Sequence, residues 1–241
     1  MDRQRPTAVW AAINARARVD GKPVSLDTVC LICEQTLRAQ GVSVALNDRL
    51  MGYEPVCASG SGAYGLMDLH VMLGEGPGCD ALAGDRPVLV GDLAEDGMQR
   101  RWPMFAPAAV QAGVRASFAF PLLLGAISVG VLEISRAGAG WLTPQESADA
   151  LVFADAALLV QVQQLATPDG AVGEPKELRW GAAERWAEVH QATGMVAVQS
   201  RTDLSTAFAR LRAHAFADER SLLEVARDVV ARQLRFEPDS V

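Results

Sequence analysis

Three kinds of residue in this sequence could support chemistry: four cysteines, three histidines and a group of C-terminal arginines. Cys30 and Cys33 form a Cys-x-x-Cys pair, a spacing found in redox and zinc sites. On a helix, however, this spacing puts both thiols on the face that carries Val29 and Leu37, where free cysteine packs as a small apolar residue. A zinc site needs two further ligands, and no second cysteine or histidine pair stands nearby. We therefore expect core cysteines and no metal.

The histidines, His70, His190 and His214, are far apart in the sequence, and we expect each to be a surface or half-buried residue. No Ser-His-Asp order, tight carboxylate pair or glycine-rich phosphate loop accompanies them. Gly60-Ser61-Gly62 is better explained as a turn before a helix. The sequence therefore predicts no enzymatic activity and no cofactor.

The arginines of residues 184–236 set this segment apart in charge. The whole chain has a net charge of −7, whereas this segment has eight arginines, seven acidic residues and no lysine, which gives it +1 and leaves −8 elsewhere. Arginine suits bidentate phosphate contacts and stacking on nucleobases. The alternative is that these arginines pair with acidic neighbours on solvated helix faces.

Length and composition limit the class of protein. With 241 residues, half of them hydrophobic, the chain can form two globular domains. No apolar run approaches the roughly 18 residues of a membrane helix, and the segment Met1–Pro6 is not followed by the apolar core of a signal peptide. The cysteines show no disulfide framework, which suits a reducing compartment. We expect a cytoplasmic protein that does not engage a membrane.

Residues 20–165 alternate between helical patterns and short β-branched runs, after a helical extension over residues 1–19. Helices are expected at Leu26–Ala39, Leu66–Leu73, Met104–Ala112 and Pro144–Leu165. Strands are expected at Val42–Leu46, Tyr53–Ser59, Pro87–Val90, Ala116–Phe120 and Ala126–Ser135. This pattern predicts an α+β domain with a central, mostly antiparallel sheet.

Several short motifs follow one another in this region. They are Leu73-Gly74-Glu75-Gly76-Pro77 with Asp80-Ala81, Pro87-Val88-Leu89-Val90 with Asp92-Leu93, Arg101-Trp102-Pro103 with Phe105, Gly113-Val114-Arg115-Ala116 leading into Phe120-Pro121-Leu122, and Gly125 with Gly130-Val131-Leu132. In this order they resemble the GAF domain, a sensory fold of bacterial signalling proteins, over residues 20–165. The resemblance implies a GAF-type antiparallel sheet flanked by helices. The Asn-Lys-x-Phe-Asp-Glu signature of cyclic-nucleotide GAF domains is absent.

The resemblance also implies a pocket over one face of the sheet, which binds small molecules in many GAF domains. Its candidate lining is Cys79, Asp92, Trp102, Phe105, Phe118 and Phe120. This mostly apolar set is typical of a site for an uncharged or weakly polar small molecule. The alternative is that the same residues are hydrophobic core, which would leave the domain as a scaffold.

Three short amphipathic helices fit residues 184–236. The first would bury a face made of Trp186, Val189, Thr193 and Val196. Gly194 is expected to let a neighbouring helix come close, because glycine inside a helix costs about 1 kcal/mol relative to alanine. Thr202 can cap the second helix, and Ser221 with Glu224 forms a capping box at the start of the third.

The order of residues in these helices is similar to that of the ANTAR domain, a three-helix RNA-binding module of bacterial transcription antiterminators. The matching residues are Ala192, Gly194-Met195, Ala207-Phe208, Leu211-Arg212, Val225-Ala226 and Val229-Val230. The resemblance implies binding to tandem RNA hairpins in a leader transcript, which prevents a terminator from forming. The expected RNA-facing residues are Gln191, Thr193, Gly194, Arg201, Arg210 and Arg212, and residue 193 is usually Lys in the family. The alternative is that these helices serve as a dimerisation or protein-docking module.

The predicted helix Pro144–Leu165 carries a broad apolar stripe. Leu151, Leu158 and Leu165 repeat at seven-residue intervals, beside Val152 and Leu159. We expect part of this stripe to pack against a second copy and form a homodimer, or else within the same chain. Residues 166–183 are expected to be a linker and connecting helix, and residues 237–241 a C-terminal tail.

Overall fold

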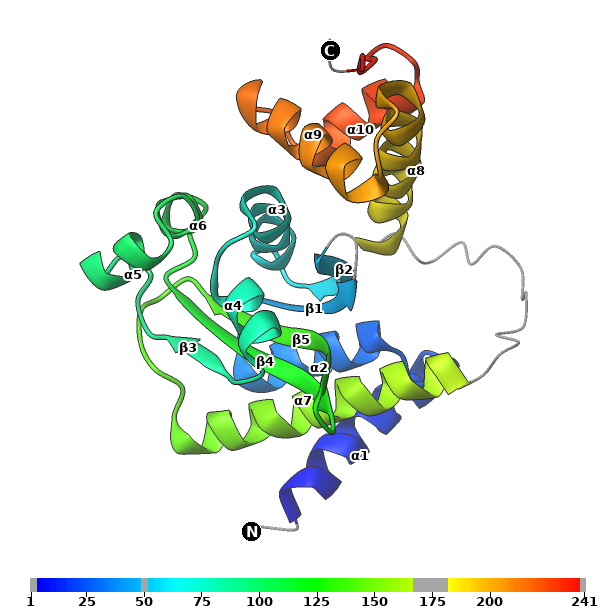
Figure 1. Ribbon diagram of the computed structural model, residues 1–241. Helices are drawn as coiled ribbons and strands as arrows, with labels where there is room; N and C mark the ends of the chain where they lie inside the picture. The colour runs from blue at the N-terminus through cyan, green and yellow to red at the C-terminus, as the bar shows by residue number, and fades with distance from the viewer. Residues whose placement is uncertain (1–3, 49–51, 167–181, 239–241) are drawn as a thin grey trace. The chain divides into compact units, whose positions relative to one another are not determined.

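A computed structural model describes residues 4–48, 52–166 and 182–238 (Figure 1). The chain divides into two compact units. The first, called the sheet unit, consists of residues 1–47 and 53–177, and the main segment of the second, called the helical unit, is residues 178–241.

The sheet unit is built around five strands in the order β2-β1-β5-β4-β3. The strands are β1 (Gly41–Asp48), β2 (Gly52–Ser59), β3 (Val88–Val90), β4 (Ala116–Leu124) and β5 (Ile127–Arg136). The β1–β5, β5–β4 and β4–β3 pairs are antiparallel. The register aligns Val42 and Phe118 with Ile134, and it aligns Ser43 and Ala119 with Glu133. Because side chains alternate along a strand, one face of the sheet is apolar and the other carries polar groups.

Three helices cover the apolar face: α1 (Gln4–Val19), α2 (Leu26–Leu37) and α7 (Pro144–Ala166) (Figure 1). They share one core cluster with Phe118 and Phe120 of β4 and Leu132 and Ile134 of β5. Helix α2 begins at the predicted position, where the Ser25 side chain accepts a hydrogen bond from the Thr28 backbone N–H. Helix α7 is capped by Thr143, whose Oγ1 accepts a hydrogen bond from the Glu146 backbone N–H at 3.2 Å.

Four shorter helices lie over the opposite, polar face: α3 (Ala63–Leu73), α4 (Pro77–Gly84), α5 (Asp96–Arg101) and α6 (Phe105–Gln111) (Figure 1). The Glu75 carboxylate accepts the backbone N–H groups of Met104 and Phe105, both at 2.8 Å, and so caps α6. Gly76 has a φ of +120°, and a Cβ there would stand 2.5 Å from the His70 ring. The Gly-Glu-Gly-Pro motif is therefore explained by close packing between α3, α4 and α6.

The helical unit consists of α8 (Ala182–Ser200), α9 (Leu204–Ala217) and α10 (Leu222–Val230). Its interior contains the predicted apolar residues Trp186, Val189, Val196, Phe208, Leu211, Val225 and Val229, each less than 7% exposed. The predicted capping box of Ser221 and Glu224 is confirmed. The cap of α9 is a correction, because Asp203 rather than Thr202 accepts the hydrogen bond, from the Thr206 backbone N–H at 2.9 Å.

The expected α+β architecture and the three C-terminal helices are confirmed. Two helices of the sheet unit were missed. Helices α4 and α5 were not predicted, because Pro and Gly at their starts resemble loop residues and α5 has only six residues. Most of the predicted linker lies outside the described residues, as do residues 239–241 of the predicted tail.

Candidate functional site

The helical unit has an open surface groove with a volume of about 540 Å³. Its lining comes from α8 and from the segment that follows α10: Gln191, Gly194, Met195, Val198, Gln199, Arg232 and Arg235. Positions 191, 194, 195 and 198 follow helical spacing, so they form one continuous face of α8. The groove therefore places two guanidinium groups and two amides beside apolar side chains.

Gly194 lines this groove. The expectation that Gly194 lets a neighbouring helix come close is therefore wrong. A Cβ placed on Gly194 would meet no atom within 4 Å. Nothing within the described chain thus requires glycine here, although glycine weakens a helix by about 1 kcal/mol relative to alanine. Its effect is to leave the helix backbone open to whatever enters the groove.

Five arginines of the helical unit fall into two groups. Arg220 pairs with Asp228 and Arg227 with Glu188, both at 2.7 Å. In contrast, the exposed side chains of Arg201, Arg232 and Arg235 form no ion pair within residues 182–238. These three arginines are therefore available to an external anion.

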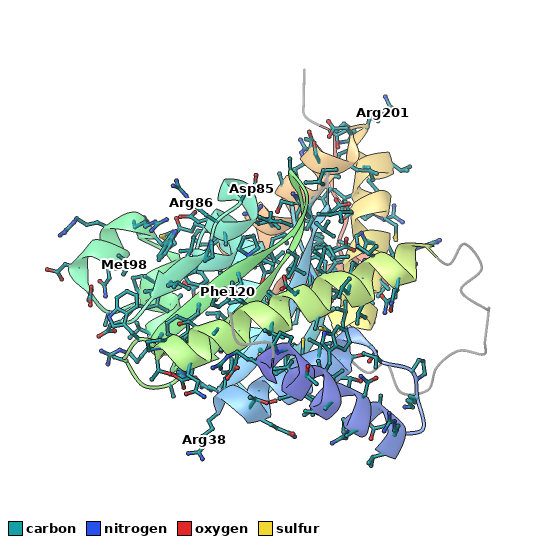
Figure 2. All side chains as sticks on the ribbon, turned by 90° about the horizontal axis from the view of Figure 1, so that it is seen from below. Arg38, Asp85, Arg86, Met98, Phe120 and Arg201 are labelled. Carbon is teal, nitrogen blue, oxygen red and sulfur yellow. The ribbon has the colours of Figure 1, made fainter. Side chains whose placement is uncertain are left out.

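The structure brings together only part of the predicted RNA-facing set. Gln191 and Gly194 line the groove, and Arg201 is exposed directly after the end of α8 (Figure 2). Arg210 and Arg212 lie on α9 and not in the groove; the Arg210 guanidinium donates to the Glu237 backbone carbonyl at 3.1 Å, and that of Arg212 lies 5.8 Å from the Phe208 ring centroid.

Thr193 was also predicted to face the RNA, and the structure corrects this prediction. Its side chain is only 3% exposed, and its hydroxyl donates to the Val189 carbonyl at 2.7 Å. The prediction that Thr193 faces the RNA is therefore wrong for this side chain, because it belongs to the buried face of α8. Sequence reasoning missed Gln199, Arg232 and Arg235 as groove residues, since the fold of the segment after α10 brings the two arginines to α8.

The six predicted pocket residues do not surround one pocket in the sheet unit. Phe118 and Phe120 belong to the core on the α2 and α7 face, whereas Trp102 and Phe105 belong to a second core with Leu66. Phe120 is labelled in Figure 2. All four aromatic side chains are at most 2% exposed. The alternative that they are hydrophobic core fits these positions, and the prediction of one shared lining is wrong.

Asp92, also in the predicted lining, has a structural partner instead. Its carboxylate accepts two hydrogen bonds from the Arg115 guanidinium, at 2.9 and 2.7 Å, and one from the Ala94 backbone N–H. These hydrogen bonds lower the pKa of Asp92. Asp92 therefore orders the loop that follows β3.

A buried polar cluster does lie on the other face of the sheet, around Glu133 of β5. The Glu133 carboxylate is 1% exposed and lies 2.8 Å from Nε2 of His70, a side chain that is fully buried. This is an ion-pair distance, although the ring N–H direction falls outside hydrogen-bond geometry. Ser117 donates to the carboxylate at 2.6 Å and Tyr53 at 3.5 Å. The expectation that His70 is a surface or half-buried residue is thus wrong.

The charge state of His70 follows from its surroundings. Burial lowers the pKa of His70, but the Glu133 carboxylate and the Cys79 thiol raise it, to about 10 overall. Burial also raises the pKa of Tyr53 well above its usual value, as does Glu133. At neutral pH the cluster therefore holds an imidazolium against a carboxylate, beside a neutral phenol.

Cys79 is the sixth predicted pocket residue, and it belongs to this cluster. Its Sγ lies 3.7 Å from His70 Nδ1, and the His70 ring stacks on Phe105 with the ring centroids 4.4 Å apart. Sequence reasoning found Cys79 and Phe105 but not His70 or Glu133. The one available signal was a single carboxylate within the otherwise apolar and uncharged centre of β5.

The other three cysteines are core residues, which was predicted for Cys30 and Cys33 but not for Cys57. Cys30, Cys33 and Cys57 are at most 2% exposed and share the core cluster of the α2 and α7 face. Burial raises the pKa of Cys33 and of Cys57 well above the usual value. Within the described residues, no group of three His, Cys, Asp or Glu side chains is arranged to hold a metal ion.

Comparison with known proteins gives a family match for the helical unit and a similar fold for the sheet unit. Residues 181–230 match the family model of the ANTAR domain. The GAF domain of a phosphoenolpyruvate-protein phosphotransferase from Coxiella burnetii is 16% identical, with a TM-score of 0.51, over 69% of this chain and 98% of that chain. The corresponding GAF domain from Acinetobacter is 13% identical, with a TM-score of 0.49, over 68% and 94%. The fold assignment rests on the former. No curated protein sequence matches the chain.

Proposed function

We propose that this chain, which joins a GAF domain to an ANTAR domain, is a regulator that binds RNA hairpins and acts in transcription antitermination. The observation that carries the proposal is the groove along α8, which lies within the residues that match the ANTAR family and in the segment just after them. In this proposal the chain is a regulator and not an enzyme.

The composition of the groove supports a nucleic acid as its ligand. Arg232 and Arg235 supply cations for phosphate groups, and Gln191 and Gln199 supply amide donors and acceptors for base edges. Met195 and Val198 offer apolar surface for an unstacked base, and Gly194 allows the backbone of a ligand to approach α8. Single-stranded loops of hairpins present these groups together.

The GAF domain is proposed as the sensory and dimerisation unit. Leu151 and Leu159 on α7 are each 50% exposed and lie two turns apart on the same face. Leu158 and Val152, in contrast, pack against the core of the sheet unit. We therefore narrow the predicted interface to the face of Leu151 and Leu159. A homodimer would present two ANTAR domains, which suits tandem hairpins because the second binding event becomes intramolecular.

The proposed location is the cytoplasm, where transcripts are made. Among the described residues, no helix is long and apolar enough to cross a membrane.

Sequencing of RNA crosslinked to the protein in its host tests the proposal. We expect enrichment of leader transcripts that contain two neighbouring hairpins, and loss of this enrichment when Arg232 and Arg235 are both replaced by Ala. The matched control is the Arg220→Ala/Arg227→Ala variant, which removes the same charge from arginines that are paired. Equal RNA recovery from the two variants would contradict the proposed site.

One observation favours protein docking by the ANTAR helices instead. Val198 in the groove is 81% exposed, and Phe216 on α9 is 52% exposed. Exposed apolar side chains of this size also occur at protein interfaces. If the crosslinking experiment recovers no hairpin RNA, the protein-docking function is the one that remains.

A further inference from the structure

We propose that Cys79 of the GAF domain is a reactive thiol, activated by the His70–Glu133 pair, which hydroperoxides oxidise to a sulfenic acid. The order of groups is thiol, imidazole and carboxylate, with Sγ 3.7 Å from Nδ1 and Nε2 2.8 Å from the Glu133 carboxylate. This is the order of nucleophile, imidazole and orienting carboxylate that is found around activated nucleophiles.

Both nitrogens of the His70 ring face groups that accept protons. Nε2 faces the Glu133 carboxylate, which only accepts when ionised, and Nδ1 lies 3.1 Å from the Glu75 carbonyl oxygen, which also only accepts. The ring therefore carries both protons, in agreement with the raised pKa of His70. Its Nδ1–H then lies between the Glu75 carbonyl and the sulfur of Cys79, and the Cys79 thiol, while protonated, donates to the His70 backbone carbonyl at 3.8 Å.

A hydrogen-bond donor and a positive charge next to sulfur are the surroundings in which cysteines react as nucleophiles. Cys79 is also the third residue of α4, and the first turn of a helix favours negative charge. The nearby acid Asp80 pairs with Arg101 at 2.6 Å, and Tyr53 stays neutral, so neither opposes a negative charge on Cys79.

The cluster is held in place by close packing. A Cβ on Gly78 would lie 2.9 Å from the Tyr53 ring, 3.0 Å from Glu133 Oε2 and 3.1 Å from His70 Nε2. A Cβ on Gly76 would overlap the rings of His70 and Phe105. The sequence thus has glycine at both positions where the α4 turn meets the cluster, and the imidazole has little freedom to turn away from Cys79.

Cys79 differs from the other thiols of the chain in its exposure to solvent. Cys79 is partly exposed, whereas Cys30, Cys33 and Cys57 are buried on the opposite face of the sheet.

In the proposed step, the thiolate attacks one peroxide oxygen, an S–O bond forms and the O–O bond breaks. Sulfur loses two electrons, and the leaving alkoxide or hydroxide takes a proton from water. Because no other cysteine of the chain lies beside Cys79, a small external thiol then forms a mixed disulfide and releases water.

The first test compares the alkylation rates of the four cysteines in the folded, full-length protein. Limited iodoacetamide labelling at pH 7, followed by peptide mass spectrometry, should label Cys79 at least about tenfold faster than the other three. In Glu133→Gln, which keeps the side-chain shape but removes the charge, the Cys79 rate should fall about tenfold at pH 7. The difference should shrink near pH 10, where ordinary thiols are ionised. Glu95→Gln, at an exposed position, is the control and should change neither rate.

The second test uses hydrogen peroxide with dimedone, which traps sulfenic acids. The adduct should form on Cys79 in the wild type and be absent from Cys79→Ser. If Glu133→Gln does not fold by circular dichroism, Tyr53→Phe takes its place, because it removes only one hydrogen-bond donor to Glu133 and should slow labelling less than tenfold. Peroxide that leaves Cys79 unmodified in the native wild type, or equal labelling of Cys79 in wild type and Glu133→Gln across pH 7–10, overturns the proposal.

Discussion

The two domains of this protein place their charged groups differently. In the GAF domain, the His70–Glu133 pair is at most 1% exposed, and its oxygen and nitrogen atoms have further polar neighbours. In the ANTAR domain, the Arg227–Glu188 pair has a similar length but its side chains are 59% and 40% exposed. The first pair lies in the interior of the GAF domain. The second lies on the surface of the ANTAR domain, outside its apolar three-helix core.

This difference indicates which part of each domain can respond to its surroundings. A buried pair is screened little by salt and is sensitive to loss of either partner. Exposed arginines contribute little to stability but are free to exchange solvent for a phosphate. We infer that chemical change acts on the interior of the GAF domain, and that binding acts on the surface of the ANTAR domain.

The largest expected effect is that of removing one partner of the buried pair. Glu133→Ala leaves the His70 imidazolium without its carboxylate and should lower the free energy of unfolding of the GAF domain by about 3–5 kcal/mol. Glu188→Ala, the matched change in the ANTAR domain, should cost less than about 1 kcal/mol. Urea unfolding measures both. Equal losses in the two variants would remove the contrast between the domains.

The same pair predicts how stability depends on pH. The pKa of His70 is raised in the folded state to about 10, so its contribution is fully present below the unfolded value of about 6.5. It is lost as pH rises through about 10, at up to about 1.4 kcal/mol per pH unit within that window. Unfolding measured from pH 6.5 to pH 10 should show this loss in the wild type. In Glu133→Gln the slope should be smaller, and an equally steep slope there would assign it to other groups.

A third effect concerns the α7 surface of the GAF domain. Leu151→Glu/Leu159→Glu should give monomers in light scattering, because both side chains are half-exposed and charge would enter the proposed interface. Gln145→Glu/Gln164→Glu adds the same charge to exposed positions of α7 and should remain dimeric. Asp155 lies between the two leucines, and burial raises its pKa, so we expect the dimer to tighten as pH falls. A folded double-leucine variant that stays dimeric places the interface elsewhere.

The smallest expected effect is at Thr193 of the ANTAR domain. Thr193→Val keeps the volume and removes a hydroxyl that serves only the Val189 carbonyl of the same helix. RNA affinity, measured by fluorescence anisotropy, should therefore change by less than about twofold, because no group at the surface is altered. A large loss of affinity would mean that RNA binding opens this part of the helix.

The contrast between the domains also explains what could be predicted from sequence. In the ANTAR domain, helical periodicity alone predicted that Trp186, Val189 and Val196 are buried, because each helix has one apolar face. Assigning Thr193 to both the buried face and the RNA surface contradicted that same periodicity. Arg232 and Arg235 could not be assigned to the groove, since the turn after α10 determines their position.

In the GAF domain, the strands and most helices were predictable, but the polar cluster was not. Strand alternation places Phe118 and Phe120 on one face of β4, but the predicted lining combined them with Trp102 and Phe105, which belong to a different core. Glu133 and His70 come from β5 and α3, 63 positions apart in the sequence, and only the packed fold brings them together. Long-range pairs of this kind leave no periodic signal in a single sequence.

The salt dependence of RNA binding tests the central claim most directly. With a tandem-hairpin leader RNA, log K should fall linearly with log salt, with a slope of roughly −0.7 to −0.9 for each phosphate neutralised. Arg232→Ala/Arg235→Ala should make this slope less steep by somewhat under two units, whereas Arg220→Ala/Arg227→Ala should leave it nearly unchanged, because those two arginines already pair with Asp228 and Glu188. Equal slopes in the two variants, or no saturable binding by the wild type at low salt, would contradict RNA recognition by the α8 groove.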